Sequence, residues 1–322
     1  MKTLRVAGDE FTVGVAIPTS GRPRYLEECL ASVLGQTRRP DEVVVSDDGG
    51  DAEAAAVVAR FAADLPIRHI VNVPPLREQR NRRQAFRETT STFVAMVDDD
   101  DAWEQRFLEV TSRTLAEHPG CGFCSTDHWW MDADGHVLTG LTEKNSRAFG
   151  RERMTAGVYE DVFLRHLERK PFAFQSTLFR RETLETIGFV PVGSEGAAID
   201  FSIFLELGAK RVPACYVPER LGRYRVHPGQ ATRRRVLMSE SVLATFERVA
   251  AYDLSREERA MLGRRYRSGV IENAIAHAHA GERRGALAAL GRFGTLGLGP
   301  PPLRRLAVLG ALLAGVEPRS QP

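Results

Sequence analysis

The chain has 322 residues, of which 43% are hydrophobic and 27% charged, so it can bury one large core or two closely joined lobes. Its formal net charge of +2 excludes the global basic field with which a protein recruits nucleic acid. Its four cysteines are too few for a disulfide scaffold, which predicts a protein of the reducing cytoplasm.

The first half of the sequence alternates between short apolar runs and amphipathic segments. Strands are expected at residues 11–17, 42–45, 67–71, 93–97 and 121–125, and helices at 24–34, 52–61, 76–88 and 104–118. This alternation predicts an α/β fold, with a doubly wound and mostly parallel sheet that has helices on both faces.

The pattern is looser from about Trp129 onward. We expect a polar loop at residues 140–157, helices at 158–169 and 199–207, and strands at 172–179, 212–217 and 221–226. The tail from Val236 has a helical pattern with breaks at Gly281 and at residues 300–302. Cys121 and Cys124 form a CxxC motif, but no second pair stands at zinc-finger spacing, so a place in a buried strand is favoured over a zinc or redox site.

The two ends of the sequence argue against membrane insertion. Asp9 and Glu10 interrupt any apolar segment of a signal peptide. The late apolar run at residues 306–316 is shorter than the roughly 20 residues of a membrane span. Because Arg304 and Arg305 stand beside this run, it predicts an interfacial helix in peripheral contact with the inner face of the membrane. Packing against the rest of the chain, or against a second copy in a homodimer, is the alternative.

Acidic residues follow two of the expected strands. Asp47 and Asp48 follow the second strand, and four consecutive aspartates, residues 98–101, follow the fourth. Ligands of open α/β sheets bind beyond the carboxyl ends of the strands. Four adjacent carboxylates repel one another, and a bound divalent cation such as Mn²⁺ or Mg²⁺ would relieve that repulsion. The alternative is a solvated acidic turn at the start of the next helix, but the second acidic strand end favours a metal site.

Two common nucleotide motifs are missing. The first strand is not followed by GxGxxG, which argues against a dinucleotide oxidoreductase, and the absence of GxxxxGK[ST] excludes a P-loop NTPase.

Several segments, in this order, resemble the family 2 glycosyltransferases. Residues 15–37 and 40–49 resemble the opening of that family, Arg80 and Asn81 its Arg-Asn pair, and residues 97–103 its DxD segment. Residues 179–189, Asp200 and residues 224–227 resemble its acceptor-side landmarks. The resemblance covers roughly residues 11–235 and implies a glycosyltransferase type-A fold.

The resemblance also implies roles on the donor side. Thr19 would lie against the donor base, and the carboxylate of Asp48 would accept the imide N–H of uracil or thymine. Arg77 and Arg80 would contact the base or the diphosphate, with a solvated helix face as the alternative. Asp99 would contact the ribose or the diphosphate.

The metal ligands and the base follow from the same resemblance. Asp98, Asp100 and His227 would hold the divalent metal. Asp200 would be the general base, with a helix N-cap as the alternative and Glu195 as its nearest rival.

These roles predict an inverting, metal-dependent glycosyltransferase. It would move a sugar from a nucleotide-diphosphate sugar, UDP- or dTDP-linked by preference, to a hydroxyl of a glycan, lipid-linked glycan or natural product. The alternatives are a sugar-phosphate nucleotidyltransferase and a non-catalytic nucleotide-sugar-binding protein. The expected organisation is a nucleotide-sugar-binding half at residues 1–130, an acceptor-binding half at 131–235 and a helical extension at 236–322.

Overall fold

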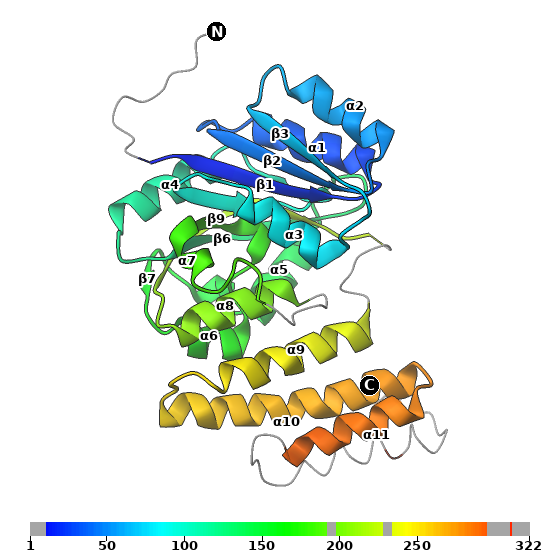
Figure 1. Cartoon of the computed structure of the whole chain (residues 1–322). Coiled ribbons are helices and arrows are strands. Elements are labelled where there is room, and N and C mark those ends of the chain that lie inside the picture. Colours follow the sequence, from blue (N-terminus) through cyan, green and yellow to red (C-terminus); the bar gives the residue numbers. More distant parts are fainter. Residues whose placement is uncertain (1–10, 192–197, 228–233, 295–309, 311–322) are drawn as a thin grey trace. The chain divides into compact units, whose positions relative to one another are not determined.

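The computed structural model describes residues 11–191, 198–227, 234–294 and 310 (Figure 1). Contacts divide the chain into two units that are discontinuous in sequence. The first comprises residues 1–162, 169–190 and 211–227, and the second comprises residues 163–168, 191–210 and 228–322.

The first unit is built on a nine-stranded sheet of order β3-β2-β1-β4-β8-β6-β9-β5, with β7 beside β9. The strands are β1 (Val13–Thr19), β2 (Glu42–Asp48), β3 (Ile67–Asn72), β4 (Phe93–Met96), β5 (Ala102–Trp103), β6 (Phe123–Met131), β7 (Gly157–Tyr159), β8 (Thr177–Arg180) and β9 (Ala214–Arg225). Strands β1 to β4 are parallel, as are β6 and β9, whereas β8 runs antiparallel to both β4 and β6. The expected mostly parallel α/β sheet is confirmed.

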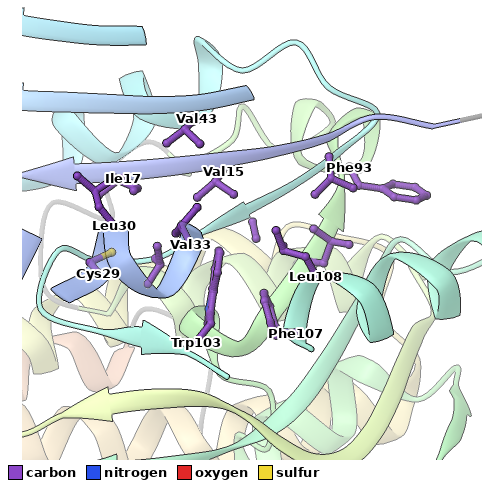
Figure 2. Packing of buried hydrophobic residues seen from close by; sticks show 14 of the residues in the cluster. Val15, Ile17, Cys29, Leu30, Val33, Val43, Phe93, Trp103, Phe107 and Leu108 are labelled. Atoms are coloured by element: carbon purple, nitrogen blue, oxygen red, sulfur yellow. The ribbon is translucent and has the colours of Figure 1, made fainter. Parts of the chain in front are cut away.

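One face of this sheet carries the main core (Figure 2). Alternate residues of β1 (Val13, Val15 and Ile17) pack with apolar side chains of α1 (Pro23–Leu34), α2 (Ala52–Phe61) and α4 (Phe107–Glu117). Helix α3 (Glu78–Arg87) buries Ala85 and Phe86, and the Phe86 ring meets that of Phe179 in β8 edge-on. Because helices cover the strands, β1 is buried along its whole length, which explains its continuous apolar sequence.

The four cysteines are free and buried, and all of them belong to this core. Cys124 of β6 lies opposite Cys215 in the register of the neighbouring strand β9. The expected core position of the CxxC motif is therefore confirmed.

The expected polar loop at residues 140–157 is wrong. This stretch contains α5 (Thr139–Ala148), a short 3-10 helix (Arg151–Arg153) and the start of β7. The buried residues of α5 are Thr142 and Ser146, so the helix has no apolar stripe by which its sequence could reveal it. The two short strands expected at residues 212–226 are one strand, β9.

The second unit is helical. Its core joins α8 (Ile199–Ala209), α9 (Arg235–Val249) and α10 (Arg256–His279) with part of α6 (Val162–Arg169), and α11 (Arg283–Gly291) packs on α10. A capping box at Ser255 and Glu258 starts α10, and Gly281, with φ of 77°, separates α10 from α11 as expected. No described helix is long and apolar enough to cross a membrane. Apart from Gly310, the tail expected to contact a membrane or a second subunit lies outside the described residues.

Candidate active site

An acidic loop, residues 98–101, begins two residues beyond the end of β4. The turn is closed by a hydrogen bond of 3.0 Å from the backbone N–H of Asp101 to the carbonyl of Asp98. It places one carboxylate oxygen each of Asp98, Asp100 and Asp101 within 4.8 Å of one another. Asp98 and Asp100 were expected to act together, whereas Asp101 was not singled out from the sequence.

His227 is the last residue of the first unit in sequence, and its side chain contacts Asp100 of the acidic loop. It lies two residues beyond the end of β9, and its Nε2 atom is 3.0 Å from Oδ2 of Asp100. Its ring packs against that of Tyr25 in α1, with the ring centroids 5.4 Å apart. The structure therefore places His227 against Asp100, although 127 positions separate the two, and Asp100 in turn lies beside Asp98 in the acidic loop.

The donor atoms fit a divalent cation. In octahedral coordination at about 2.1 Å, neighbouring ligand atoms lie about 3 Å apart, which is the separation between the His227 nitrogen and the Asp100 oxygen. Carboxylate oxygens with one imidazole nitrogen suit Mn²⁺ and Mg²⁺. Arg82 donates two hydrogen bonds of 3.0 and 2.7 Å to Asp98. This carboxylate would therefore bind a cation while it remains paired with Arg82.

The carboxylates of the loop are unequally neutralised. Burial raises the pKa of Asp99 to about 7, and Asp100 adds to the rise while Arg22 opposes it. Burial, with repulsion from Asp100 and Asp98, also raises the pKa of Asp101 well above its usual range. Burial acts on Asp98 as well, but the guanidinium of Arg82 outweighs it and lowers the pKa of that carboxyl. The loop is thus short of positive charge.

Two further arginines hold the loop in place. The guanidinium of Arg22, just before α1, forms ion pairs with both Asp99 and Asp100. The backbone N–H of Arg225 donates to Asp101 at 2.8 Å, and its Nε donates to the carbonyl of Asp100 at 2.7 Å. Arg22, Arg82 and Arg225 were not singled out from the sequence, because nothing in their spacing shows which way their side chains turn.

The expected base-binding residues lie beside the loop. The Thr19 hydroxyl is buried and donates to Asp99 at 2.7 Å. The two oxygens of Asp48 accept the backbone N–H groups of Leu76 and Arg77 at 2.6 and 2.8 Å. Asp48 thereby orders the segment between β3 and α3, where Arg77 has a φ of 71°.

The two arginines expected at the donor site are exposed. Arg77 precedes α3 and Arg80 lies in its first turn, and neither side chain is buried. Arg82, half a turn further on, is the α3 arginine that reaches the acidic loop.

Asp200, the expected base, belongs to the second unit. It is exposed and lies in the first turn of α8, where one of its oxygens accepts the N–H of Phe201 at 2.7 Å. The N-cap of this helix is Ala198, so the alternative that Asp200 is the helix cap is wrong. Its rival Glu195 lies outside the described residues.

A buried carboxylate outside the acidic loop, that of Asp127, lies at the irregularity in β6 where the register with β9 shifts. It accepts hydrogen bonds from Arg151 Nε at 2.6 Å, Ser146 Oγ at 3.1 Å and Arg220 Nε at 3.4 Å. Burial raises the pKa of Asp127, but Arg151 outweighs it and the pKa is lowered. The neighbouring His128 is neutral because burial and Arg151 lower its pKa to about 3.

Comparison with known proteins decides what this site belongs to. Residues 14–126, which include the acidic loop, match the model of Glycosyl transferase family 2. The chain is a glycosyltransferase, and its residues 14–126 are similar to family 2 of these enzymes. The glycosyltransferase is 23% identical over 231 residues to the amylovoran biosynthesis glycosyltransferase AmsE of Erwinia amylovora, a likeness that covers 70% of this chain and 79% of AmsE.

Two solved structures share the fold of this glycosyltransferase. TarS 1–349 of S. aureus has a TM-score of 0.68 at 16% identity, covering 94% of this chain and 87% of the other. The mannosyltransferase PcManGT of Pyrobaculum calidifontis, in complex with GDP-Man and Mn²⁺, has a TM-score of 0.61 at 20% identity, covering 96% and 81%. The expected type-A fold is confirmed.

Proposed function

We propose that this glycosyltransferase is inverting and metal-dependent, and that it transfers a sugar from a nucleotide-diphosphate sugar to an acceptor hydroxyl. The observation that carries this proposal is the cluster of Asp98, Asp100 and Asp101 beyond the end of β4, with His227 in contact with Asp100. This is the edge of an α/β sheet at which ligands bind.

Asp100 and His227 would hold the divalent cation, with Asp98 or Asp101 completing the set. A cation bound there supplies charge neutralisation for the departing diphosphate. Arg82 keeps the carboxylate of Asp98 ionised and fixes its orientation, so this metal ligand is in place before the cation binds. The description of PcManGT in complex with GDP-Man and Mn²⁺ agrees with a metal in this fold.

Uracil or thymine is the proposed donor base. The Asp48 oxygens each accept one backbone N–H, and a carboxylate oxygen can accept a second hydrogen bond. It can therefore take the imide N–H of uracil or thymine, which cytosine lacks at the matching edge. TarS has been solved with UDP and with UDP-GlcNAc.

The base preference is tested by calorimetry of UDP, dTDP and GDP in saturating Mn²⁺. We expect UDP or dTDP to bind at least tenfold more tightly than GDP, because the N1–H of guanine lies further from the ribose than the N3–H of a pyrimidine and would not meet Asp48 in the same position. Tighter binding of GDP would rule out the proposed role of Asp48.

Asp200 is the proposed general base, which takes the proton of the acceptor hydroxyl as the glycosidic bond forms. The first turn of a helix stabilises a carboxylate in its ionised form, which a base requires. Asp200→Asn should lower the transfer rate by roughly 10²–10⁴-fold with unchanged nucleotide affinity. Glu206 lies on the same helix as Asp200 and is buried against Arg248 of α9, so Glu206→Gln offers the contrast and should lower stability instead. Normal transfer by Asp200→Asn would assign the base elsewhere.

The acceptor is proposed to be a glycan, a lipid-linked glycan or a natural product. AmsE is described as an amylovoran biosynthesis enzyme, which favours the glycan class. Peripheral membrane contact or dimer formation through the C-terminal helices stays a prediction, as do the limits proposed for the domains.

The whole proposal is tested with a panel of nucleotide sugars in the presence of Mn²⁺. We expect slow release of nucleotide from one donor, abolished by EDTA and restored by added metal. Nucleotide release that is indifferent to EDTA would contradict the metal dependence, and a sugar phosphate plus nucleoside triphosphate reaction would indicate nucleotidyl transfer.

A further inference from the structure

The guanidinium of Arg22 lies between two carboxylates of the acidic loop. Its Nη2 atom pairs with Asp99 and its Nη1 atom with Oδ2 of Asp100, while Nε donates to Asp99 at 3.2 Å. About a third of the side chain, 34%, is exposed. It therefore sits at the surface of the acidic loop, with an open side toward solvent.

Arg22 engages the oxygen that the proposed metal site needs. Oδ2 of Asp100 accepts from Arg22 and also lies 3.0 Å from Nε2 of His227. A cation held by Asp100 and His227 would stand within a few ångströms of the guanidinium, where two positive charges repel strongly. Arg22 and the cation therefore compete for one carboxylate oxygen.

The other arginines of the site do not share this position. Arg82 pairs with Asp98 and with Glu78. The guanidinium of Arg225 pairs with Glu28 and donates to backbone carbonyls. Among the described residues, Arg22 is the arginine whose guanidinium meets Asp99 and Asp100.

We propose that Arg22 couples metal binding to donor binding. It is a positioning residue that neutralises Asp99 and Asp100 before the donor arrives and then turns its guanidinium onto the diphosphate, which leaves the Asp100 oxygen to the cation. The planar fork of arginine matches phosphate oxygens. Arg22 also follows Gly21, whose φ is 63° and where an added Cβ would meet no atom of the described residues within 4 Å beyond its chain neighbours, so the turn has room to adjust. This inference rests on the proposed metal site.

The coupling predicts two effects of Arg22→Met in opposite directions. Mn²⁺ affinity without nucleotide, measured by EPR of the free ion, should rise about tenfold because a competing charge is removed. UDP affinity in saturating Mn²⁺, measured by calorimetry, should fall about tenfold because the diphosphate loses its guanidinium. A merely structural role would loosen the site and weaken both affinities.

Two further variants complete the test. Arg60→Met removes the same charge from α2, where Arg60 forms an exposed ion pair with Glu27 of α1, and should change neither affinity. Arg22→Lys keeps the charge without the fork, so Mn²⁺ affinity should stay close to that of the parent while UDP affinity falls. This variant also serves if Arg22→Met does not fold.

The outcomes separate the two proposals. If the parent protein binds Mn²⁺ but Arg22→Met binds it no more tightly, or if Arg22→Lys keeps full UDP affinity, the coupling by Arg22 is wrong. If the folded parent does not bind Mn²⁺ with or without UDP, the metal-dependent function itself is wrong.

Discussion

The acidic loop and Asp127 bury carboxylates in opposite ways. At Asp127 one carboxylate meets two arginines, a serine hydroxyl and a backbone N–H, and its pKa is lowered. In the acidic loop three carboxylates, Asp98, Asp99 and Asp100, share the guanidinium groups of Arg22 and Arg82, and the pKa values of Asp99 and Asp101 are raised.

The difference separates a structural ion pair from a binding site. A buried carboxylate with its partners in place needs nothing more, whereas a cluster with too little positive charge is unstable until a cation joins it. Burial of acidic residues therefore indicates function here only where the neutralising groups fall short.

The largest expected effect is that of Asp100→Asn. Transfer should fall by about 10³-fold or more, since the cation loses a ligand and the diphosphate loses its neutralisation. The folded protein should not lose stability, because the substitution removes a repelling charge. Donor turnover and thermal unfolding measure the two effects, with Asp134→Asn in an exposed pair with Arg24 as the control. Retention of parent activity by Asp100→Asn would place the metal elsewhere.

Arg151→Met should lower the stability of the protein and leave its metal binding unchanged, which is the reverse of the effect of Asp100→Asn. It strips Asp127 of its main partner and should cost about 3–5 kcal/mol of unfolding free energy, because an unpaired charge is left buried. Mn²⁺ affinity of the folded protein should be unchanged. Urea unfolding checks the first effect and EPR the second, and the double variant with Asp127→Asn should recover much of the stability. A loss below about 1 kcal/mol would show that Arg220 alone suffices for Asp127.

The smallest effect concerns pH. His128 has a pKa of about 3 when folded and about 6.5 when unfolded, so the unfolded chain binds the extra proton between these values. Its contribution to stability is complete above pH 6.5 and is lost as the pH falls toward 3, by up to about 1.4 kcal/mol per pH unit.

The measurement compares urea unfolding between pH 7 and pH 5. Stability of the parent should fall more steeply than that of His128→Gln, in which this proton is absent. His136→Gln, at a position 79% exposed, should keep the parent slope. Parallel profiles for the parent and His128→Gln would show that His128 is accessible to protons in the folded state.

Much of the fold could be predicted because the first half of the sequence is periodic. Strands β1 to β4 are apolar runs separated by amphipathic helices, and this pattern specifies a parallel sheet. Helix α5 escaped prediction because it buries hydroxyl groups of Thr142 and Ser146 rather than a hydrophobic stripe. Strand β5 also escaped, because two residues carry no periodicity.

The candidate site could likewise be predicted only in part from the sequence. The aspartates at 98–101 are visible in the sequence as four like charges after an apolar strand, and together with the second acidic strand end at Asp47 and Asp48 they predict a cation. His227 was found through its resemblance to a family motif, since no local spacing connects it to Asp100.

Which arginines meet which carboxylates was decided by the tertiary structure. Arg22 depends on the turn after β1 and Arg82 on the rotational phase of α3, so the helix arginines chosen from the sequence, Arg77 and Arg80, proved to be exposed.

The sequence by itself determined the order of β1 to β4 and of α1 to α4, the acidic end of β4 and the resemblance to a family, because these depend on local periodicity, like-charge repulsion and motif order. The tertiary structure alone decided how the charges are balanced. That balance depends on side chains that meet across positions as distant as Arg22 and Asp99, or Asp127 and Arg220, and the energy of a charge is set by its nearest partners in space.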